Sequence, residues 1–332
     1  MNKKIVVHTG AQPGAPLPEE REALNAPDIE LVLRGPCKTP AEVAAAVRDA
    51  DVALCYGEPY TREVFAQAPR LKGVVRYGIG VDTIDLDAAS DYGVLVANFP
   101  DFCIAEVANH ALVLLLACAK KIVRLDNTLR QQGWAAARAL LEPMGTIHDE
   151  TLGLIAFGNI ARALAKRAQV LDMRVIAYDP YVAPEVFAQA GVERVDLEEL
   201  AARADYVSCH VPATPQTKGM IDAAFFRRMK PTAYFINTSR GAVVNEADLI
   251  RALQEGWIAG AGLDVFESEP IGQDHPFCRL PNVVLTPHTA SWADATFASL
   301  RRRVGRAALA LARGELPEFV ANPAALSHRR KD

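Results

Sequence analysis

The sequence predicts an α/β protein of two domains, each built on a parallel sheet with helices on both faces. Three observations support this fold class. Short runs rich in Val, Ile and Leu alternate with helical patterns along most of the chain, and such alternation is typical of parallel sheets. The alternation stops once, between about residues 104 and 150, and then resumes. The chain has 332 residues, enough for two domains with a core each.

The first hundred residues contain five expected strands with helical patterns between several of them. A long helical pattern without Gly or Pro follows from Ile104 to about Gln131, and it is rich in Ala and Leu. A turn-rich stretch, 140–150, ends this middle part. The five expected strands are residues 3–8, 29–34, 51–56, 72–78 and 93–98.

The second half contains six more expected strands, which are enough for a Rossmann-type sheet. A last helical pattern, from about Ala293 to Arg313, comes too late to belong to that sheet. We therefore expect a Rossmann domain, residues 104–291, inserted into a first domain of residues 1–103 plus 292–332. The hinges are expected near 100–103 and 291–294. The six strands are expected at 151–157, 174–180, 205–211, 233–239, 260–266 and 283–288.

Residues 151–164 have the pattern of a phosphate-binding turn between a strand and a helix. The usual G-x-G-x-x-G spacing is replaced here by Ala156, Gly158 and Ala161. Gly158 keeps the position at which a backbone without Cβ approaches a pyrophosphate, and alanine is an accepted third residue. Ala156 is tolerated if its backbone stays at negative φ. We therefore expect an altered turn that still binds a dinucleotide.

Asp179 ends the next expected strand, about 20 residues after the turn, as the dinucleotide-binding pattern requires. A carboxylate there accepts hydrogen bonds from ribose hydroxyls and repels a 2′-phosphate. The next two residues are Pro and Tyr, so no adjacent arginine welcomes that phosphate. The sequence therefore predicts NAD rather than NADP as the cofactor.

Composition excludes several other classes. The formal net charge of −4 argues against nucleic acid as the main partner. The longest apolar run, 111–119, is too short to span a bilayer, and the N-terminus lacks a signal-peptide pattern. The six cysteines form neither a C-x-x-C pair nor a zinc-finger spacing, so we expect no metal site and a reducing, cytoplasmic location.

Three polar residues stand at the ends of expected strands, where doubly wound sheets bind their ligands. They are Arg240, Glu269 and His288, in that order behind the glycine turn. Each has an ordinary structural interpretation alone, as a surface ion pair, a loop acid or a helix cap. Their joint order makes them the candidate catalytic residues.

These segments together resemble the D-isomer-specific 2-hydroxyacid dehydrogenases, a family that includes D-lactate, glycerate/hydroxypyruvate and 3-phosphoglycerate dehydrogenases. The resemblance covers nearly the whole chain. It implies an NAD domain inserted into a flavodoxin-like substrate domain, and reversible hydride transfer between NAD(H) and a small 2-hydroxy or 2-oxo acid. The segments that follow the family signatures in order are 151–165, 237–253, 262–270 and 285–291.

The resemblance assigns a role to each candidate catalytic residue. Arg240 grips the carboxylate and carbonyl oxygen of the substrate, for which a planar guanidinium is suited. His288 gives a proton to the carbonyl oxygen and takes it back in the reverse reaction. Glu269 holds one ring nitrogen of His288 and favours the imidazolium. Reduction is therefore expected to be favoured at lower pH and oxidation at higher pH.

The same resemblance nominates residues that contact the cofactor and the substrate. On the first domain, residues 75–85 resemble the family loop whose amides hold the substrate carboxylate. Gly78 and Ile79 are expected to supply those amides, while Arg76 supplies a second cationic contact or a structural ion pair. The expected cofactor contacts are Gly158, Asn159, Ile160, Asp179, His210, Pro212, Thr217, Thr238 and Asp264.

Three functions remain open from the sequence. The leading hypothesis is a dehydrogenase of a small 2-hydroxy acid. 3-Phosphoglycerate dehydrogenase is an alternative, because Arg76 would suit a phosphorylated substrate. An NAD-sensing interaction protein similar to the C-terminal binding proteins is the third, although Trp292 lies one position later than their tryptophan. Formate dehydrogenase is disfavoured, because it has glutamine where this chain has Glu269. The sequence does not specify the side chain of the acid.

The helical pattern that begins at Ile104 has more apolar surface than one domain usually covers. Members of the family commonly dimerise through this region, so we expect a homodimer. Two hinges also imply that the domains close over the substrate, which excludes water from hydride transfer.

Overall fold

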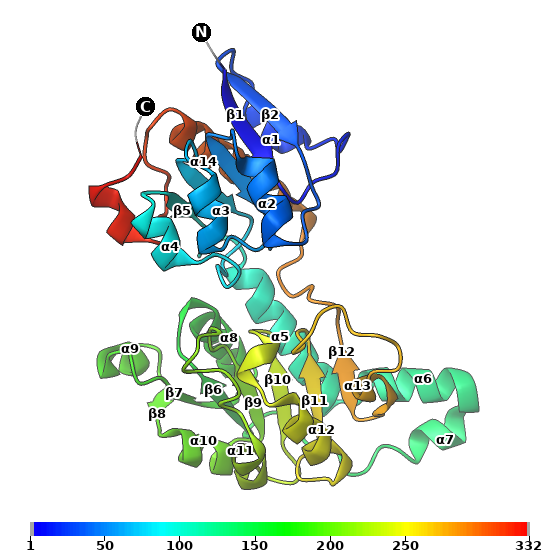
Figure 1. Cartoon of the computed structure of the whole chain (residues 1–332). Helices are drawn as coiled ribbons and strands as arrows, with labels where there is room; N and C mark the ends of the chain where they lie inside the picture. The colour runs from blue at the N-terminus through cyan, green and yellow to red at the C-terminus, as the bar shows by residue number, and fades with distance from the viewer. Residues whose placement is uncertain (1–2, 331–332) are drawn as a thin grey trace. The chain divides into compact units, whose positions relative to one another are not determined.

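The computed structural model describes residues 3–330. Contacts divide the chain into two compact units, Met1–Phe102 with Ala293–Asp332 and Cys103–Trp292. The first unit is therefore discontinuous in sequence, and Figure 1 shows its C-terminal part, in orange and red, beside its blue N-terminal part.

The first unit is built on a five-stranded parallel sheet in the order β2-β1-β3-β4-β5. This is the flavodoxin-like order, whose switch point lies between β1 and β3. Alternate strand residues separate its two cores: Val6 and Val75 face one core, whereas Val7 and Val74 face the other. The strands are β1 (Lys4–His8), β2 (Ile29–Leu33), β3 (Val52–Cys55), β4 (Gly73–Arg76) and β5 (Leu95–Ala97).

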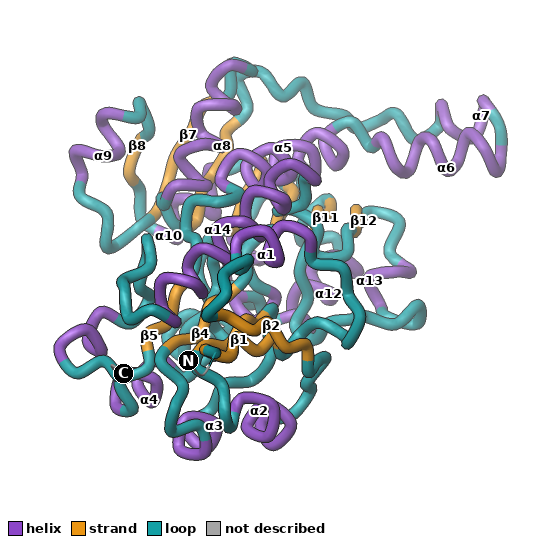
Figure 2. The backbone as a smooth tube through the Cα atoms, turned by 90° about the horizontal axis from the view of Figure 1, so that it is seen from above, coloured by secondary structure: helices purple, strands orange, loops and turns teal. Residues whose placement is uncertain are grey.

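Helices cover both faces of this sheet (Figure 2). The long α14 (Asp294–Ala312) packs with α1 (Pro18–Ala23) on one face. Gly305 allows this close approach, because a Cβ there would lie 2.6 Å from the Ala23 Cβ. The other face carries α2 (Pro40–Val47), α3 (Arg62–Gln67) and α4 (Leu86–Asp91).

The second unit is built on a seven-stranded parallel sheet in the order β12-β11-β10-β9-β6-β7-β8. The chain reverses direction across the sheet between β6 and β9, and ligands of such sheets bind beyond the strand ends at that point. The strands are β6 (Thr151–Ile155), β7 (Arg174–Tyr178), β8 (Glu193–Arg194), β9 (Tyr206–Cys209), β10 (Tyr234–Asn237), β11 (Gly260–Leu263) and β12 (Val283–Leu285).

The prediction of six strands in this unit missed β8. With two residues, β8 is too short to produce a periodic pattern, and pairing with β7 alone defines it. Besides the helices between residues 104 and 138, the α-helices of the unit are α8 (Asn159–Val170), α9 (Pro184–Gln189), α10 (Leu197–Arg203), α11 (Ala223–Arg228), α12 (Glu246–Gln254) and α13 (Pro276–Arg279).

The prediction of one helix from Ile104 to about Gln131 was wrong. The structure has α5 (Ile104–Ala119) and α6 (Ile122–Gln132), separated by Lys121 with φ 50. The Lys121 ammonium donates to the Leu140 carbonyl at 2.9 Å, which holds the break. Helix α5 buries one face against the sheet, whereas α6 buries no residue. With α7 (Trp134–Arg138), α6 forms an arm that projects from the unit (Figure 2).

Within residues 3–330, none of the helices combines the length and the apolar character that crossing a membrane demands.

Candidate active site

The glycine turn follows β6 directly and begins with a strained residue. Ala156 has φ 70, so the expectation of a negative φ was wrong. The left-handed conformation lets Ala156 N–H donate to Tyr178 O at 2.8 Å and Phe157 N–H donate to Asp179 Oδ2 at 2.8 Å. These two bonds tie the turn to the end of β7. A β-carbon in this region costs about 1–2 kcal/mol, so the turn is kept at the expense of stability.

Gly158 leaves an opening at the start of α8. A Cβ on Gly158 would meet no protein atom within 4 Å, so packing does not demand a glycine there. The helix that follows has no side-chain cap at its N-terminus, and such a terminus favours anions. Asn159 begins that helix, and its side chain accepts from Arg162. Together these features fit the pyrophosphate of a dinucleotide.

Asp179 is only 8% exposed and is already hydrogen-bonded. Besides the bond from Phe157, its Oδ1 accepts from the amides of Tyr181 at 2.8 Å and Val182 at 3.2 Å. The carboxylate therefore fixes both the glycine turn and the loop after β7. A carboxylate has about four acceptor positions, so the predicted ribose contact is compatible with this role.

Of the other predicted cofactor residues, Ile160 lies in α8 and Asp264 follows β11, while the remaining four lie in the segments after β9 and β10. His210 N–H donates to Ile155 O, and its Nε2 lies 2.9 Å from Ser208 Oγ. Burial lowers the pKa of His210 to about 4, which keeps the ring neutral near pH 7. Thr217 donates to Pro212 O at 2.7 Å and so shapes the loop after β9. Thr238 Oγ1 is buried with no hydrogen-bond partner within the described chain, and such atoms call for a ligand or water.

His288 and Glu269 form a hydrogen-bonded pair. His288 Nδ1 lies 2.7 Å from Glu269 Oε2, while Glu269 Oε1 accepts from Phe266 N–H at 3.0 Å. Partial burial raises the pKa of Glu269, but the bonds from His288 and Phe266 and the nearby charges of His288 and Arg240 outweigh it. The pKa of Glu269 lies below its ordinary value. The ionised carboxylate can only accept, so Nδ1 carries the hydrogen and Nε2 is left for chemistry.

The turn that carries His288 is held by Asp264, which is fully buried. Asp264 Oδ1 accepts from Thr286 Oγ1 at 2.6 Å and Thr289 N–H at 2.8 Å, and Oδ2 accepts from Ala290 N–H at 2.9 Å. His288 itself has φ 53 and donates its N–H to Asp264 O. Asp264 therefore anchors the turn, and its predicted contact with the cofactor stays a prediction.

Arg240 lies in the loop after β10, and Gly241 brings that loop against the loop after β11. A Cβ on Gly241 would lie 1.9 Å from the Phe266 carbonyl carbon, so only glycine allows this contact. The Arg240 guanidinium donates to Ser239 O, and Asn237 Nδ2 donates to Arg240 O. This packing places the charge of Arg240 near enough to Glu269 to lower its pKa.

The predicted substrate loop belongs to the first unit and follows β4. Arg76 donates to Tyr77 O, and Gly78, with φ 131, donates its N–H to Arg76 O at 3.0 Å. The carbonyl of Gly78 accepts from Phe99 N–H. Because the peptide is planar and trans, Ile79 N–H points away from Phe99. The Gly78 amide is thus already engaged, and the geometry favours Ile79 as the amide donor.

Sequence reasoning missed several residues that hold the site. Thr286 lies two residues before His288, and its hydroxyl also lies 2.9 Å from His110 Nε2. Glu246 and His275 form a second pair at 3.0 Å near the loop that carries Glu269. Of these residues, only Thr286 could have been found from the sequence, through the segment Thr-Pro-His that it begins. Glu246 and His275 lie far apart in the sequence and meet only when the chain folds.

The chain matches the family model described as "D-isomer specific 2-hydroxyacid dehydrogenase, NAD binding domain" over residues 112–290. It is 41% identical over 278 residues to glyoxylate reductase of Korarchaeum cryptofilum, covering 83% of this chain and 84% of that protein. It is 42% identical over 264 residues to D-3-phosphoglycerate dehydrogenase of Mycobacterium leprae, covering 79% of this chain and 49% of that protein.

The structure is also similar to a solved glyoxylate/hydroxypyruvate reductase from Sinorhizobium meliloti, described as NADPH-dependent and in complex with NADP and malonate. The TM-score is 0.85 at 28% identity, and the similarity covers 100% of both chains. The two-sheet fold expected from the sequence is therefore confirmed, while the choice between NAD and NADP depends on individual residues.

Ala156→Gly is expected to stabilise the protein by about 1 kcal/mol, because glycine adopts positive φ without the Cβ penalty. Ala163→Gly, in the middle of α8, is the control and is expected to destabilise it by about 1 kcal/mol. Urea unfolding followed by circular dichroism measures both. Equal destabilisation by the two variants would contradict the assigned strain at Ala156.

Proposed function

Because the chain belongs to the D-isomer-specific 2-hydroxyacid dehydrogenase family, we propose that it reduces glyoxylate or a closely related small 2-oxo acid with NADH. The observation that carries this proposal is the His288–Glu269 pair at 2.7 Å. The pair lies in the same unit as Arg240 and the glycine turn. A carbonyl reduction requires a proton donor, a cation that binds the substrate and a site for the dinucleotide. His288, Arg240 and the glycine turn would provide them.

The residues around the turn fit a dinucleotide. Gly158 and the start of α8 would hold the pyrophosphate, and Asp179 would accept from the ribose hydroxyls. The unpartnered Thr238 hydroxyl supports a polar contact on the nicotinamide side. When bound, the reduced nicotinamide supplies a hydride to the carbonyl carbon. The buried Asp179, with no adjacent arginine, supports NADH over NADPH.

Two side chains provide the remaining chemistry. The Arg240 guanidinium would bind the substrate carboxylate and polarise the carbonyl oxygen. His288 Nε2 would donate its proton to that oxygen as the carbonyl carbon is reduced, and Glu269 stabilises the imidazolium before the transfer. The neutral imidazole that remains takes a proton from solvent. In the reverse direction it accepts the hydroxyl proton.

The loop after β4, in the first unit, carries the groups that the sequence predicts for binding a carboxylate. Ile79 N–H and the Arg76 guanidinium are the groups that support a contact with the substrate carboxylate, and both belong to the first unit. A phosphorylated substrate is the alternative that Arg76 suits. It receives less support, because the 3-phosphoglycerate dehydrogenase of M. leprae is matched over 49% of its length, against 84% for the glyoxylate reductase.

Purified protein is expected to oxidise NADH in the presence of glyoxylate or hydroxypyruvate, with a higher kcat/KM than for pyruvate, phenylpyruvate or 3-phosphohydroxypyruvate. NADPH is expected to be at least tenfold poorer. His288→Gln should lower kcat by about 10²-fold or more, because the proton donor is lost. Absorbance at 340 nm measures these rates. NADH binding without turnover on any of these acids would favour the NAD-sensing alternative instead.

Glu269→Gln is expected to lower kcat for reduction at neutral pH by about tenfold or more, because the amide does not stabilise the imidazolium that donates the proton. The lowered pKa of Glu269 means that the carboxylate is ionised from neutral pH down into the acid range. The negative charge that Glu269 places beside His288 is therefore lost only at acid pH, when the carboxylate is protonated. Glu267→Gln, on the same loop, is the charge-matched control. A kcat of Glu269→Gln equal to that of Glu267→Gln would contradict the pairing.

We also propose that the protein is a cytoplasmic homodimer. All six cysteines are free thiols, which is consistent with a reducing compartment. The arm exposes Ile122 (57%), Leu129 (43%) and Trp134 (69%). A groove of about 1030 Å³ runs between the arm and the β12 side of the unit. A second copy of the chain placed against this groove would cover the exposed apolar side chains of the arm.

Analytical ultracentrifugation at micromolar concentration is expected to show a dimer. The double variant Leu129→Glu, Trp134→Glu should yield a monomer, because two charges would then be buried in the interface. Val170→Glu is the control, since Val170 is 78% exposed on α8, away from the arm. A monomeric unaltered protein would contradict the proposal.

A further inference from the structure

Glu269 lies on a surface segment that has little packing of its own. Between the buried Phe266 and the partly buried His275, residues 267–270 and 272–274 are exposed, and within this segment only Ile271 packs against the core. An exposed segment of this kind moves readily unless specific bonds hold it. The 2.7 Å bond between Glu269 and His288 therefore depends on how the ends of the segment are fixed.

One carboxylate fixes both ends. Glu246, the first residue of α12, accepts from Glu267 N–H with Oε2 at 3.0 Å and contacts His275 Nε2 with Oε1 at 3.0 Å. Glu246 is 17% exposed and His275 is 19% exposed. These bonds are therefore better protected from water than those of a surface ion pair. Gly241 packs directly behind Glu267, which keeps Glu246 within reach.

The hydrogen bonds of His275 define its tautomer. Its Nδ1 accepts from Phe277 N–H at 3.3 Å and caps α13. The neutral ring therefore carries its hydrogen on Nε2 and donates it to Glu246. Helix α13, through Phe277, is anchored in the core of the unit. The far end of the segment is thus tied to both α12 and α13.

We propose that Glu246 and His275 are positioning residues for the catalytic pair: they hold the 267–275 segment so that Glu269 stays bonded to His288 Nδ1. The inference rests on the proposed function for its kinetic consequences, and on geometry alone for the positioning itself. Misplacement of a supporting group by about 1 Å costs up to about 10²-fold in rate. Neither residue needs to touch the substrate or the cofactor.

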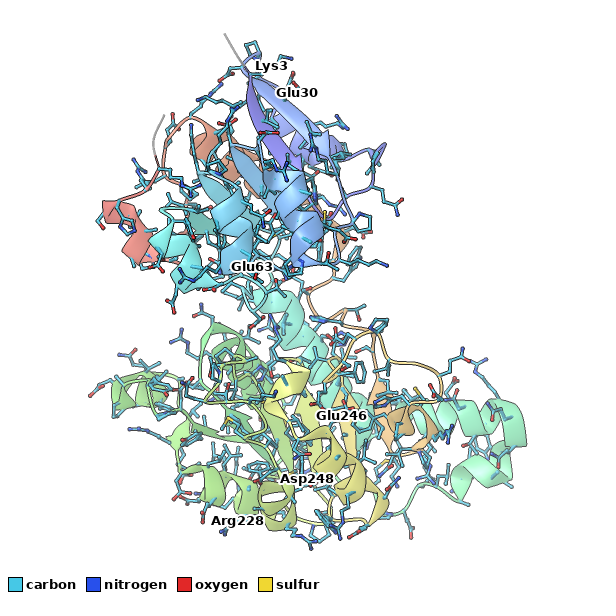
Figure 3. All side chains as sticks on the ribbon, viewed as in Figure 1. Lys3, Glu30, Glu63, Arg228, Glu246 and Asp248 are labelled. Carbon is cyan, nitrogen blue, oxygen red and sulfur yellow. The ribbon has the colours of Figure 1, made fainter. Side chains whose placement is uncertain are left out.

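The chain offers a matched control on the same helix. Asp248 lies two residues after Glu246, and its Oδ2 accepts from Ala223 N–H at 3.0 Å, on the side of α11. Figure 3 labels both residues in the second unit, with Asp248 farther from the carboxyl ends of β10 and β11. Asp248→Asn removes the same charge as Glu246→Gln. It leaves the 267–275 segment untouched.

Glu246→Gln is expected to lower kcat for 2-oxo acid reduction by about tenfold, because the amide has one oxygen for two donors. The dissociation constant for NADH should stay within twofold. Asp248→Asn should leave both quantities within twofold. His275→Asn keeps an acceptor for the α13 cap but is too short to reach Glu246, so it should reproduce the loss. Thermal unfolding by circular dichroism identifies any variant that does not fold.

A double-mutant cycle separates positioning from a general loss of stability. Glu246→Gln in a Glu269→Gln background is expected to have no further effect on kcat, because the bond it protects is already absent. Full additivity would overturn the proposal, as would an equal effect of Glu246→Gln and Asp248→Asn. If the unaltered protein reduced no 2-oxo acid, the proposed function would fail instead. The downfield NMR signal of His288 Nδ1–H, lost in Glu246→Gln but kept in Asp248→Asn, would still support the positioning role.

Discussion

The site depends on the buried carboxylate of Asp264. A fully buried charge is costly unless hydrogen bonds replace its hydration, and here Thr286, Thr289 and Ala290 provide them. Because those donors come from both sides of His288, the carboxylate closes the chain into a turn. That turn keeps His288 at φ 53, a conformation that the surrounding structure must impose on a histidine. The hydrogen bonds that satisfy this one acid thus fix the backbone position of His288, the proposed acid/base.

Three carboxylates then act in series on the same imidazole. Asp264 fixes its backbone, Glu269 contacts its Nδ1, and Glu246 holds the segment that carries Glu269. They differ in exposure: Asp264 is fully buried, the Glu246 side chain is 17% exposed, and the Glu269 side chain is 34% exposed. Asp264, which accepts hydrogen bonds from the turn that carries His288, is buried away from water. Glu269, which contacts the ring of His288 itself, remains partly exposed to solvent.

The cofactor side combines strain with support in the same way. Ala156 holds a conformation that glycine would adopt more easily, and Asp179 compensates by accepting from Phe157, Tyr181 and Val182. Asp179, which we propose selects NAD over NADP, is therefore also a structural part of the turn. This double role explains why the turn keeps its geometry although its first glycine is absent.

The sequence by itself determined the alternation of strands and helices and the expectation that one domain is inserted into the other. It also determined the candidates Gly158, Asp179, Arg240, Glu269 and His288. Those features are carried by local periodicity and by short segments whose spacing has a direct physical meaning. Only the tertiary structure decided the two-residue β8, the break at Lys121, the positive φ of Ala156 and the partnership of Glu246 with His275. Each of these depends on atoms contributed by distant segments. The local sequence does not indicate such contacts, because the partner residues come together only when the chain folds.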